Sequence, residues 1–223
     1  MMDRLREFIS AESDKLKDMT FKEKASYIWE YYKIPIIVAV AVIFLAGSLV
    51  DAIWIHPPKK MHLQIAFLEG YQSEEAMDAF AGELEAALLS PAELEEQQIM
   101  GASFMSGTGD PQMDMANSQK FFAMVAANDI DFLIFPEEAL QEYANQGMCS
   151  DLGEILDASL LDKLEGRLVR ANDETGFERM YAVRVDGIPI FEKGLNVKGQ
   201  VLAICVSSHR TENAKKAAAF IFG

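Results

Sequence analysis

The stretch from Asn128 to Gly147 reads NDIDFLIFPEEALQEYANQG. Its segment Ile130–Phe135, apolar except for Asp131, has the length and composition of a buried strand. Pro136 then fits the first turn of a helix, and Gly147 fits the residue just past its end. A buried strand followed directly by a helix is the unit from which parallel sheets are built. This stretch therefore predicts an α/β fold.

Two further strand–helix units precede it. Met61–Leu68 is a predicted strand, and Ser73 is the predicted N-cap of the helix after it. Gln98–Met105 is the next predicted strand, and Asp110, followed by a proline, is the predicted N-cap of the next helix. Three successive units predict a doubly wound, mainly parallel sheet with helices on both faces.

The second half of the chain continues the alternation. Leu152–Leu168 is predicted to be helical, and Met180–Val185 is a predicted strand before an Asp186-Gly187 tight turn and a short apolar run. Gln200–Val206 is predicted as the last strand. Thr211 is the predicted cap of a final helix that ends near Phe220.

This order of elements resembles a known family. Asn128–Leu156 is similar to the stretch of bacterial extracellular solute-binding proteins, of the ABC-transporter type with a type 2 periplasmic-binding fold, in which a strand leads into a short acidic helix, a glycine and a leucine-containing segment. The family's later regions are resembled by Tyr181, Ala182 and Val183, by Ile188 and Pro189, and by Val201–Gly223. The resemblance implies a small solute as ligand and an ABC permease as a partner.

One departure from that family changes the expectation. Only about 45 residues separate Leu156 from Gln200, too few for a full second lobe. We therefore expect about one lobe. In open α/β sheets ligands bind beyond the carboxyl ends of the strands. The predicted ligand-binding residues are Glu69, Gly70, Tyr71, Gln72, Ser106, Gly107, Thr108, Asp110, Pro136, Glu137 and Glu138.

A long apolar segment lies near the N-terminus. Ile34–Val50 reads IPIIVAVAVIFLAGSLV, and the apolar character continues to Ile55 across a single Asp51. As an α-helix this segment is about 33 Å long, the thickness of a hydrocarbon core. A cleaved signal peptide is the competing interpretation, but signal peptides place a short basic stretch directly before a short apolar run. The 33 preceding residues are mostly polar, so we expect an uncleaved transmembrane helix.

Basic residues predict the orientation of this helix. Five lysines precede it within about 20 residues, whereas only Lys59 and Lys60 follow it closely, which places the N-terminus in the cytoplasm. The expected organisation is a cytoplasmic amphipathic segment (1–33), a transmembrane helix (34–55) and an extracellular α/β domain (56–223) at the cell membrane. Thr20 and Glu23 form a predicted capping box for a helix within the first segment.

Charge restricts the partners. The chain has 35 acidic and 20 basic residues, a net charge of -15, which would repel nucleic acid. Between residues 56 and 150 there are 16 acidic residues and three basic ones. The expected partners are the lipid bilayer, an ABC permease or another membrane protein, and a small solute, with no nucleic acid.

No catalytic motif is evident. Asp129 and Asp131 precede a strand, where reactive groups do not sit in parallel sheets, so they are interpreted as solvated residues. The three histidines lack metal-site spacing, and no nucleophile has an evident base. Cys149 and Cys205 are too few for a disulfide framework but can still pair. We expect no enzyme activity, no cofactor and no bound metal.

Two functional hypotheses remain open. The first is a non-catalytic, membrane-tethered relative of solute-binding proteins with a binding or accessory role beside a transporter or another membrane complex. The second is a structural or protein-interaction module with no small-molecule ligand, which predicts an exposed apolar patch. Five methionines either fill an irregular core or form an adaptable binding surface: Met100, Met105, Met113, Met115 and Met124. A hydrolase that uses the acidic first half is a third and weaker alternative.

Overall fold

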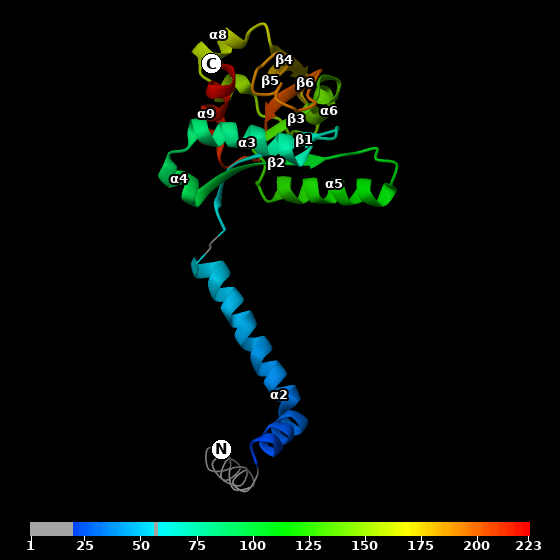
Figure 1. Ribbon diagram of the computed structural model, residues 1–223. Coiled ribbons are helices and arrows are strands. Elements are labelled where there is room, and N and C mark those ends of the chain that lie inside the picture. The colour runs from blue at the N-terminus through cyan, green and yellow to red at the C-terminus, as the bar shows by residue number, and fades with distance from the viewer. Residues whose placement is uncertain (1–19, 56–57) are drawn as a thin grey trace. The chain divides into compact units, whose positions relative to one another are not determined.

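The computed structural model describes residues 20–55 and 58–223 (Figure 1). The chain divides into two compact units, Met1–Pro58 and Lys59–Gly223. Most of the predicted cytoplasmic segment, residues 1–19, lies outside the described residues, and so does His56-Pro57.

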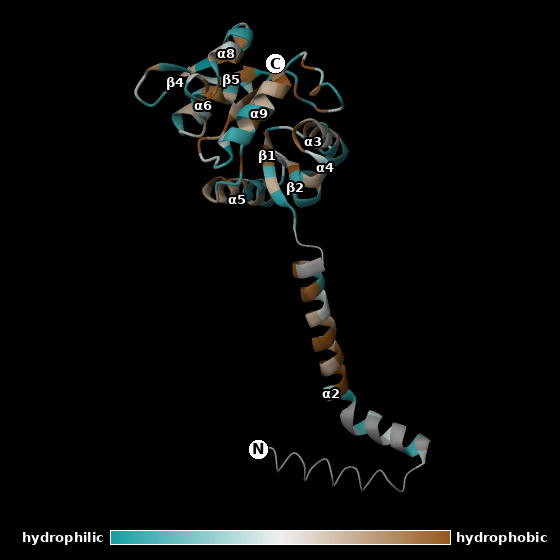
Figure 2. Ribbon diagram, turned by 90° about the vertical axis from the view of Figure 1, so that its left-hand side faces the viewer, coloured by the Kyte–Doolittle hydropathy of each residue, from teal (hydrophilic) through white to brown (hydrophobic). Residues whose placement is uncertain are grey.

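The N-terminal unit contains one long helix, α2 (Phe21–Val50), which continues as a π-helical turn over Asp51–Ile55. The backbone N–H and the hydroxyl of Thr20 both donate to Glu23 Oε2, at 2.8 and 2.7 Å, which confirms the predicted pairing at this helix start. No break separates the amphipathic and apolar parts. Pro35 lies inside the helix, and Figure 2 shows the helix bent between these two parts. Proline removes one backbone hydrogen bond, which explains a bend.

Within this helix, the 21 residues Lys33–Ile53 are long and apolar enough to cross a membrane, and their side chains are exposed. Brown colouring marks this part of the helix in Figure 2. Length and composition fit a membrane span and a signal sequence alike.

The C-terminal unit is built on one six-stranded sheet with the order β2-β1-β3-β6-β5-β4. The strands are β1 (Lys60–Leu68), β2 (Gln97–Phe104), β3 (Phe132–Pro136), β4 (Leu168–Asn172), β5 (Glu178–Arg184) and β6 (Gln200–Ile204). The three strands predicted from strand–helix units pair in parallel. The three later strands pair antiparallel, so the sheet is mixed and the expectation of a mainly parallel sheet holds for its first half only.

Helices cover both faces of this sheet (Figure 1). They are α3 (Glu74–Leu88), α4 (Pro91–Glu96), α5 (Pro111–Ala126), the 3-10 turn Glu137–Ala139, α6 (Leu140–Asn145), α7 (Leu152–Ile155), α8 (Ala158–Leu164) and α9 (Thr211–Phe222). Alternate strand residues point to opposite faces. Leu63 and Ile65 therefore pack with α3, α7, α8 and α9, whereas Ala66 and Leu68 pack with α5 and α6.

The helix caps at Ser73 and Asp110 are confirmed. Ser73 accepts a hydrogen bond from the N–H of Ala76, and Asp110 accepts from the N–H groups of Gln112 and Met113. These short polar side chains satisfy N–H groups that have no partner inside the helix. Both caps fix the point where the chain leaves a strand end and turns back along the sheet.

Several expectations for the second half were wrong. The predicted helix Leu152–Leu168 is two short helices, α7 and α8, and Leu168 begins strand β4, which the sequence did not predict. Strand β4 exists because it pairs with β5, a contact that local periodicity does not report. The apolar run after Asp186-Gly187 forms turns, and Thr211 is the first residue of α9, whose N-cap is Arg210.

Candidate functional site

The predicted ligand-binding residues lie in the segments that follow β1 and β2, at the last residue of β3 and in the turn after it. These three strands run in parallel, so the segments that follow them lie together at the carboxyl ends of the strands. Only Glu69 and Ser106 of the predicted set line a common pocket. The other residues lie in separate surroundings.

That pocket is a shallow groove between α5 and α6 with a volume of about 160 Å³. Typical ligand pockets have roughly 300–1,000 Å³, so this one has room for a side chain or a small polar molecule. Both apolar and polar side chains line it. Its lining residues are Leu68, Glu69, Phe104, Met105, Ser106, Asn117, Ser118, Phe121, Phe122, Glu142, Tyr143 and Gln146.

Glu69 and Tyr143 link the two sides of the groove. Glu69 has a φ of 56°, a left-handed backbone conformation that residues other than glycine rarely adopt. Its N–H donates to Phe104 O at 3.3 Å. The hydroxyl of Tyr143 donates to Glu69 Oε1 at 3.3 Å. Burial and the nearby Glu69 carboxylate raise the pKa of Tyr143 far above its ordinary value. The hydroxyl therefore remains a hydrogen-bond donor.

Several other predicted residues already make internal hydrogen bonds. Gln72 is 3% exposed, and its side-chain amide forms two 2.8 Å hydrogen bonds with the backbone of Asn196. Thr108 donates from its N–H and its hydroxyl to Asp114 Oδ1, at 3.0 and 2.7 Å. These contacts hold the loops in place.

The segment after β3 is also occupied by an internal contact. Glu137 binds Arg184 in a two-bond ion pair with distances of 2.6 and 2.5 Å. This pair lowers the pKa of Glu137 below its ordinary value. Pro136 ends β3, and Glu138 is exposed beside it.

The loop glycines and Tyr71 complete the predicted set. Gly70 accepts a hydrogen bond at its carbonyl from Ser103 Oγ at 3.1 Å, and Gly107 adopts a left-handed φ of 68°. Tyr71 is 68% exposed and contributes an aromatic ring to the surface at this edge.

Gln200 is a residue that sequence reasoning missed. It begins β6 opposite Pro136 and is 6% exposed, yet its side-chain oxygen has no hydrogen-bond partner among the described residues. Its Nε2 lies 3.6 Å from the point where a Cβ on Gly70 would stand. Buried polar atoms without partners are uncommon and costly. Nothing in the local sequence distinguishes this glutamine.

Strand β2 is an edge of the sheet, and half of its backbone groups face away from β1. The N–H of Ile99 donates to Glu85 Oε1 at 2.7 Å instead of to β1, and the carbonyl of Phe104 accepts from Glu69, which follows β1. Backbone groups of successive strand residues point to opposite sides. The backbone groups of Ile99, Gly101 and Ser103 therefore point outward.

Side chains bind the first and last of the β2 backbone groups that point away from β1, and the groups between them have no such partner among the described residues. Glu85 of α3 occupies the N–H of Ile99, and Asn117 of α5 donates to Met105 O at 3.0 Å. Within residues 58–223, no hydrogen bond involves the outward N–H and carbonyl groups of Gly101 and Ser103.

The edge also lacks the usual protection against pairing. Natural edge strands carry lysines, prolines or inward charges, whereas β2 reads QQIMGASF and has none of these. Helix α5 beside it has 16 residues, of which Phe121 alone is buried. Met113, Met115 and Phe122 are 51, 63 and 55% exposed. Met115 and Phe122 share one side of α5 and Met113 lies on the opposite side, so the exposed apolar side chains are divided between two sides of this helix.

The aspartates at the entrance of β3 differ from the expectation. Asp129 is exposed, but Asp131 is fully buried, so its interpretation as a solvated residue was wrong. The Asp131 carboxylate accepts hydrogen bonds from the backbone of Gln64, the hydroxyl of Ser208 and Nε of Arg210, at 2.8, 2.6 and 2.8 Å. It connects β1, β3 and the start of α9.

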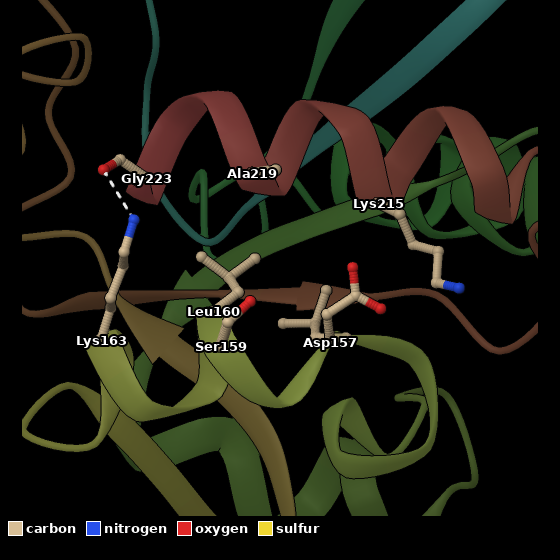
Figure 3. A pocket seen from close by; sticks show the side chains of 8 residues that line it. Asp157, Ser159, Leu160, Lys163, Lys215, Ala219 and Gly223 are labelled. Atoms are coloured by element: carbon tan, nitrogen blue, oxygen red, sulfur yellow. Dashed lines mark hydrogen bonds between the residues drawn. The ribbon is translucent and has the colours of Figure 1, made fainter.

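A second pocket lies between α8 and α9, with a volume of about 170 Å³ (Figure 3). Lys163 stands at one end, where its Nζ donates to Gly223 O at 3.4 Å. Figure 3 shows Asp157, the residue just before α8, and Lys215 of α9 toward the other end. The pocket lining contains these charged groups and the hydroxyl of Ser159.

Metal-binding groups do not converge in residues 20–55 and 58–223: no three His, Cys, Asp or Glu side chains there are placed to hold an ion. His62 Nδ1 lies 2.7 Å from Gln97 Oε1, and His209 Nδ1 lies 2.7 Å from Asn128 O. Both histidines therefore have hydrogen-bond partners of their own.

No protein-family profile and no curated protein matches the sequence. The chain is similar to an extracellular solute-binding protein family 1 structure from Alicyclobacillus acidocaldarius subsp. acidocaldarius DSM 446, with 17% identity and a TM-score of 0.33. The match covers 57% of this chain and 28% of that one. Neither a ligand nor a family follows from a match of this kind.

Proposed function

We propose that this chain is a membrane-tethered, non-catalytic binding ectodomain that holds an extended segment of a protein partner along strand β2. The observation that carries the proposal is the open, uncharged edge between Ile99 and Ser103. A peptide placed there gains main-chain hydrogen bonds to Gly101 and Ser103, which is the common mode of strand addition.

Side chains beside the edge provide contacts for such a peptide. Met100 is 44% exposed on the face of β2 that α5 covers, because it alternates with Ile99, which packs on the α3 side. Methionine side chains adapt their shape to varied partners. Met100 can therefore receive an apolar side chain of the added strand.

Charge indicates the chemistry of the partner segment. Positions 61–150 contain 16 acidic residues and one lysine, Lys120, whose Nζ lies 5.6 Å from the centre of the Phe104 ring. The exposed Glu93, Glu95 and Glu96 just before β2 lie near Lys59, which donates to Leu94 O. An acidic surface attracts a basic segment and speeds its association. The partner is an extended segment that alternates apolar residues with lysine or arginine.

The apolar part of α2 supports the tether. We assign Lys33–Ile53 as an uncleaved span with the C-terminal unit outside the cell, beside an ABC permease or another membrane complex. Such a position keeps the domain close to a partner in the same membrane and raises its effective concentration.

Site-specific photo-crosslinking in intact cells tests this function. A photoreactive residue at Met100 should give one adduct of constant mass, whereas the same residue at Phe177, which is 70% exposed away from β2, should give none. Adding Ser103→Pro should remove the adduct, because proline lacks the outward N–H.

Ser103→Ala is the matched control. It removes the hydroxyl that binds Gly70 but keeps the backbone donor, so the adduct should remain. Equal adducts from Met100 and Phe177, or an adduct that survives Ser103→Pro in a folded protein, would contradict binding at the edge.

Capture of a small polar solute at the strand ends is a second candidate, and the unpartnered oxygen of Gln200 favours it. A thermal-shift screen of sugars, amino acids and short peptides should then give a stabilising ligand whose effect disappears in Gln200→Leu. Absence of any shift across the screen would count against solute capture and leave the strand-addition proposal intact.

A further inference from the structure

Cys149 and Cys205 lie directly opposite one another in the sheet, although 56 positions separate them in the sequence. Cys149 follows α6, and Cys205 follows the last residue of β6. The two residues form an isolated antiparallel bridge. Both are free thiols in this structure.

The flanking hydrogen bonds define the type of pair. Ser150 N donates to Ile204 O, and Val206 N donates to Met148 O, both at 2.9 Å, so the cysteines between them are a non-hydrogen-bonded pair. In such pairs the Cα atoms are about 4.5 Å apart and the side chains are at their closest. That separation falls inside the range of about 4.4–6.8 Å that a disulfide spans.

Both side chains also point to the same face. Opposed residues of an antiparallel pair project together, and both thiols belong to the apolar cluster on the α5 and α6 side of the sheet. Cys149 is 5% exposed and Cys205 is 1% exposed. The two side chains therefore project from neighbouring strands into the same buried cluster, where Cys205 Sγ also lies 3.2 Å from Ser207 Oγ.

From this geometry we propose that Cys149 and Cys205 form an intramolecular cross-strand disulfide when the chain folds in an oxidising compartment. The oxidant is a small-molecule or protein disulfide. One thiolate attacks it, forms a mixed disulfide and releases one thiol. The second cysteine then attacks the mixed disulfide, forms the Cys149–Cys205 bond and releases the second thiol. The two protons lost by the cysteines are carried by the two released thiols.

The pair oxidises before its surroundings close. Burial and the neighbouring Cys205 raise the pKa of Cys149 to about 12, so little thiolate exists in the folded state near neutral pH. Once folded, a reduced pair therefore exchanges slowly. During folding the thiols are accessible, and the alignment of Met148–Ser150 beside β6 brings them together.

The bond has a consequence for the groove. Cys149 follows α6 closely, and α6 supplies Tyr143, whose hydroxyl binds Glu69 across the groove. A disulfide fastens the end of this helix to β6 and restricts the unfolded chain over a long loop. The oxidised form should therefore be more stable than the reduced form and should hold the α6 side of the groove more firmly.

The test uses the full chain in detergent, unfolded in reductant and refolded with oxidised and reduced glutathione. We expect a mass lower by two hydrogen atoms, no alkylation after denaturation, and one linked peptide pair that contains Cys149 and Cys205. The melting temperature of the wild type should fall by several degrees with reductant. Cys149→Ala and Cys205→Ala should show no such dependence.

A second experiment asks whether the disulfide forms in cells, in addition to whether the two cysteines can pair in vitro. Cells are quenched in acid, and their thiols are alkylated under denaturing conditions, so that buried free thiols also react. The absence of label on both cysteines supports oxidation in place. If both cysteines are labelled in cells but form the disulfide on refolding in vitro, the two residues can pair, and the proposal that the domain is oxidised outside the cell is wrong. Quantitative labelling after oxidative refolding would overturn the whole proposal, whereas the strand-addition function does not depend on either result.

Discussion

Asp131 is a charged residue buried inside the C-terminal unit. Its carboxylate is fully buried, and Arg210, whose side chain is 10% exposed, lies 2.8 Å away. The other bonds of this carboxylate reach the backbone of Gln64 and the hydroxyl of Ser208. One side chain therefore joins the first strand to the segment before the last helix.

Replacement of Asp131 should be strongly destabilising. Asp131→Ala leaves the Arg210 guanidinium buried without its anion and should lower the free energy of unfolding by about 3–5 kcal/mol. Chemical denaturation of the wild type and the variant measures the difference. Asp129→Ala is the matched control and should change stability by less than about 0.5 kcal/mol, because its side chain is exposed.

Glu137 makes stability depend on pH in a defined direction. Its hydrogen bonds with Arg184 lower its folded-state pKa below the ordinary value of 4.5. A lowered folded pKa contributes stability above 4.5 that is lost as the pH falls through the folded pKa. The two side chains are 36 and 42% exposed, so solvent screens the pair, and its contribution is about 0.5–1 kcal/mol.

Glu137→Gln should therefore destabilise the protein by about 0.5–1 kcal/mol near neutral pH and have no effect well below pH 4.5. Denaturation curves across this range measure both limits. Glu138→Gln, at the exposed neighbouring residue, should show no such pH-dependent difference. If the destabilisation caused by Glu137→Gln increased as the pH fell, the Glu137–Arg184 ion pair would not be its cause.

At the level of elements, α3 and α5 have similar caps but different packing. Helix α3 buries Ala76, Met77, Phe80, Ala81 and Leu84, whereas α5 buries Phe121. Most helical stability in proteins comes from packing of an apolar face. Helix α5 therefore depends more on its cap than α3 does, and we expect it to open more readily.

Removal of each cap should separate local from global stability. Asp110→Ala should speed hydrogen exchange in the first turns of α5 with little change in global unfolding, because this helix contributes little to the core. Ser73→Ala should lower the global free energy of unfolding by about 1 kcal/mol. Hydrogen-exchange mass spectrometry and denaturation measure the two effects. Equal global losses from both variants would contradict this division.

For the whole molecule, the membrane assignment rests on Lys33–Ile53. Ile43 lies near the middle of this segment and Ile53 at its end, so arginine placed at each position tests how deep in the bilayer each residue lies. Ile43→Arg places a charge at the centre of the bilayer, at a cost of about 2.5–3.5 kcal/mol, and should reduce the carbonate-resistant membrane fraction. Ile53→Arg should be tolerated, because its charge reaches the headgroups.

Two controls separate an uncleaved span from a signal sequence. An N-terminal tag should remain on the full-length protein, and protease added to intact cells should digest the C-terminal unit. A mature protein that begins after Val50 would identify the apolar segment as a cleaved signal.

The sequence determined the elements whose signals are local. The apolar run of Lys33–Ile53, the caps at Ser73 and Asp110 and the strands of the first three units each follow from residues within one turn or one strand. Periodicity and side-chain capping act over short distances, so the printed sequence contains them completely.

The tertiary structure decided everything that depends on pairing between distant segments. Strand β4 exists through its contacts with β5, and β2 is an edge because no strand lies on its far side among residues 58–223. Burial of Asp131 and opposition of Cys149 and Cys205 arise in the same way. These features join residues dozens of positions apart, and their energies depend on three-dimensional burial, which no local pattern encodes.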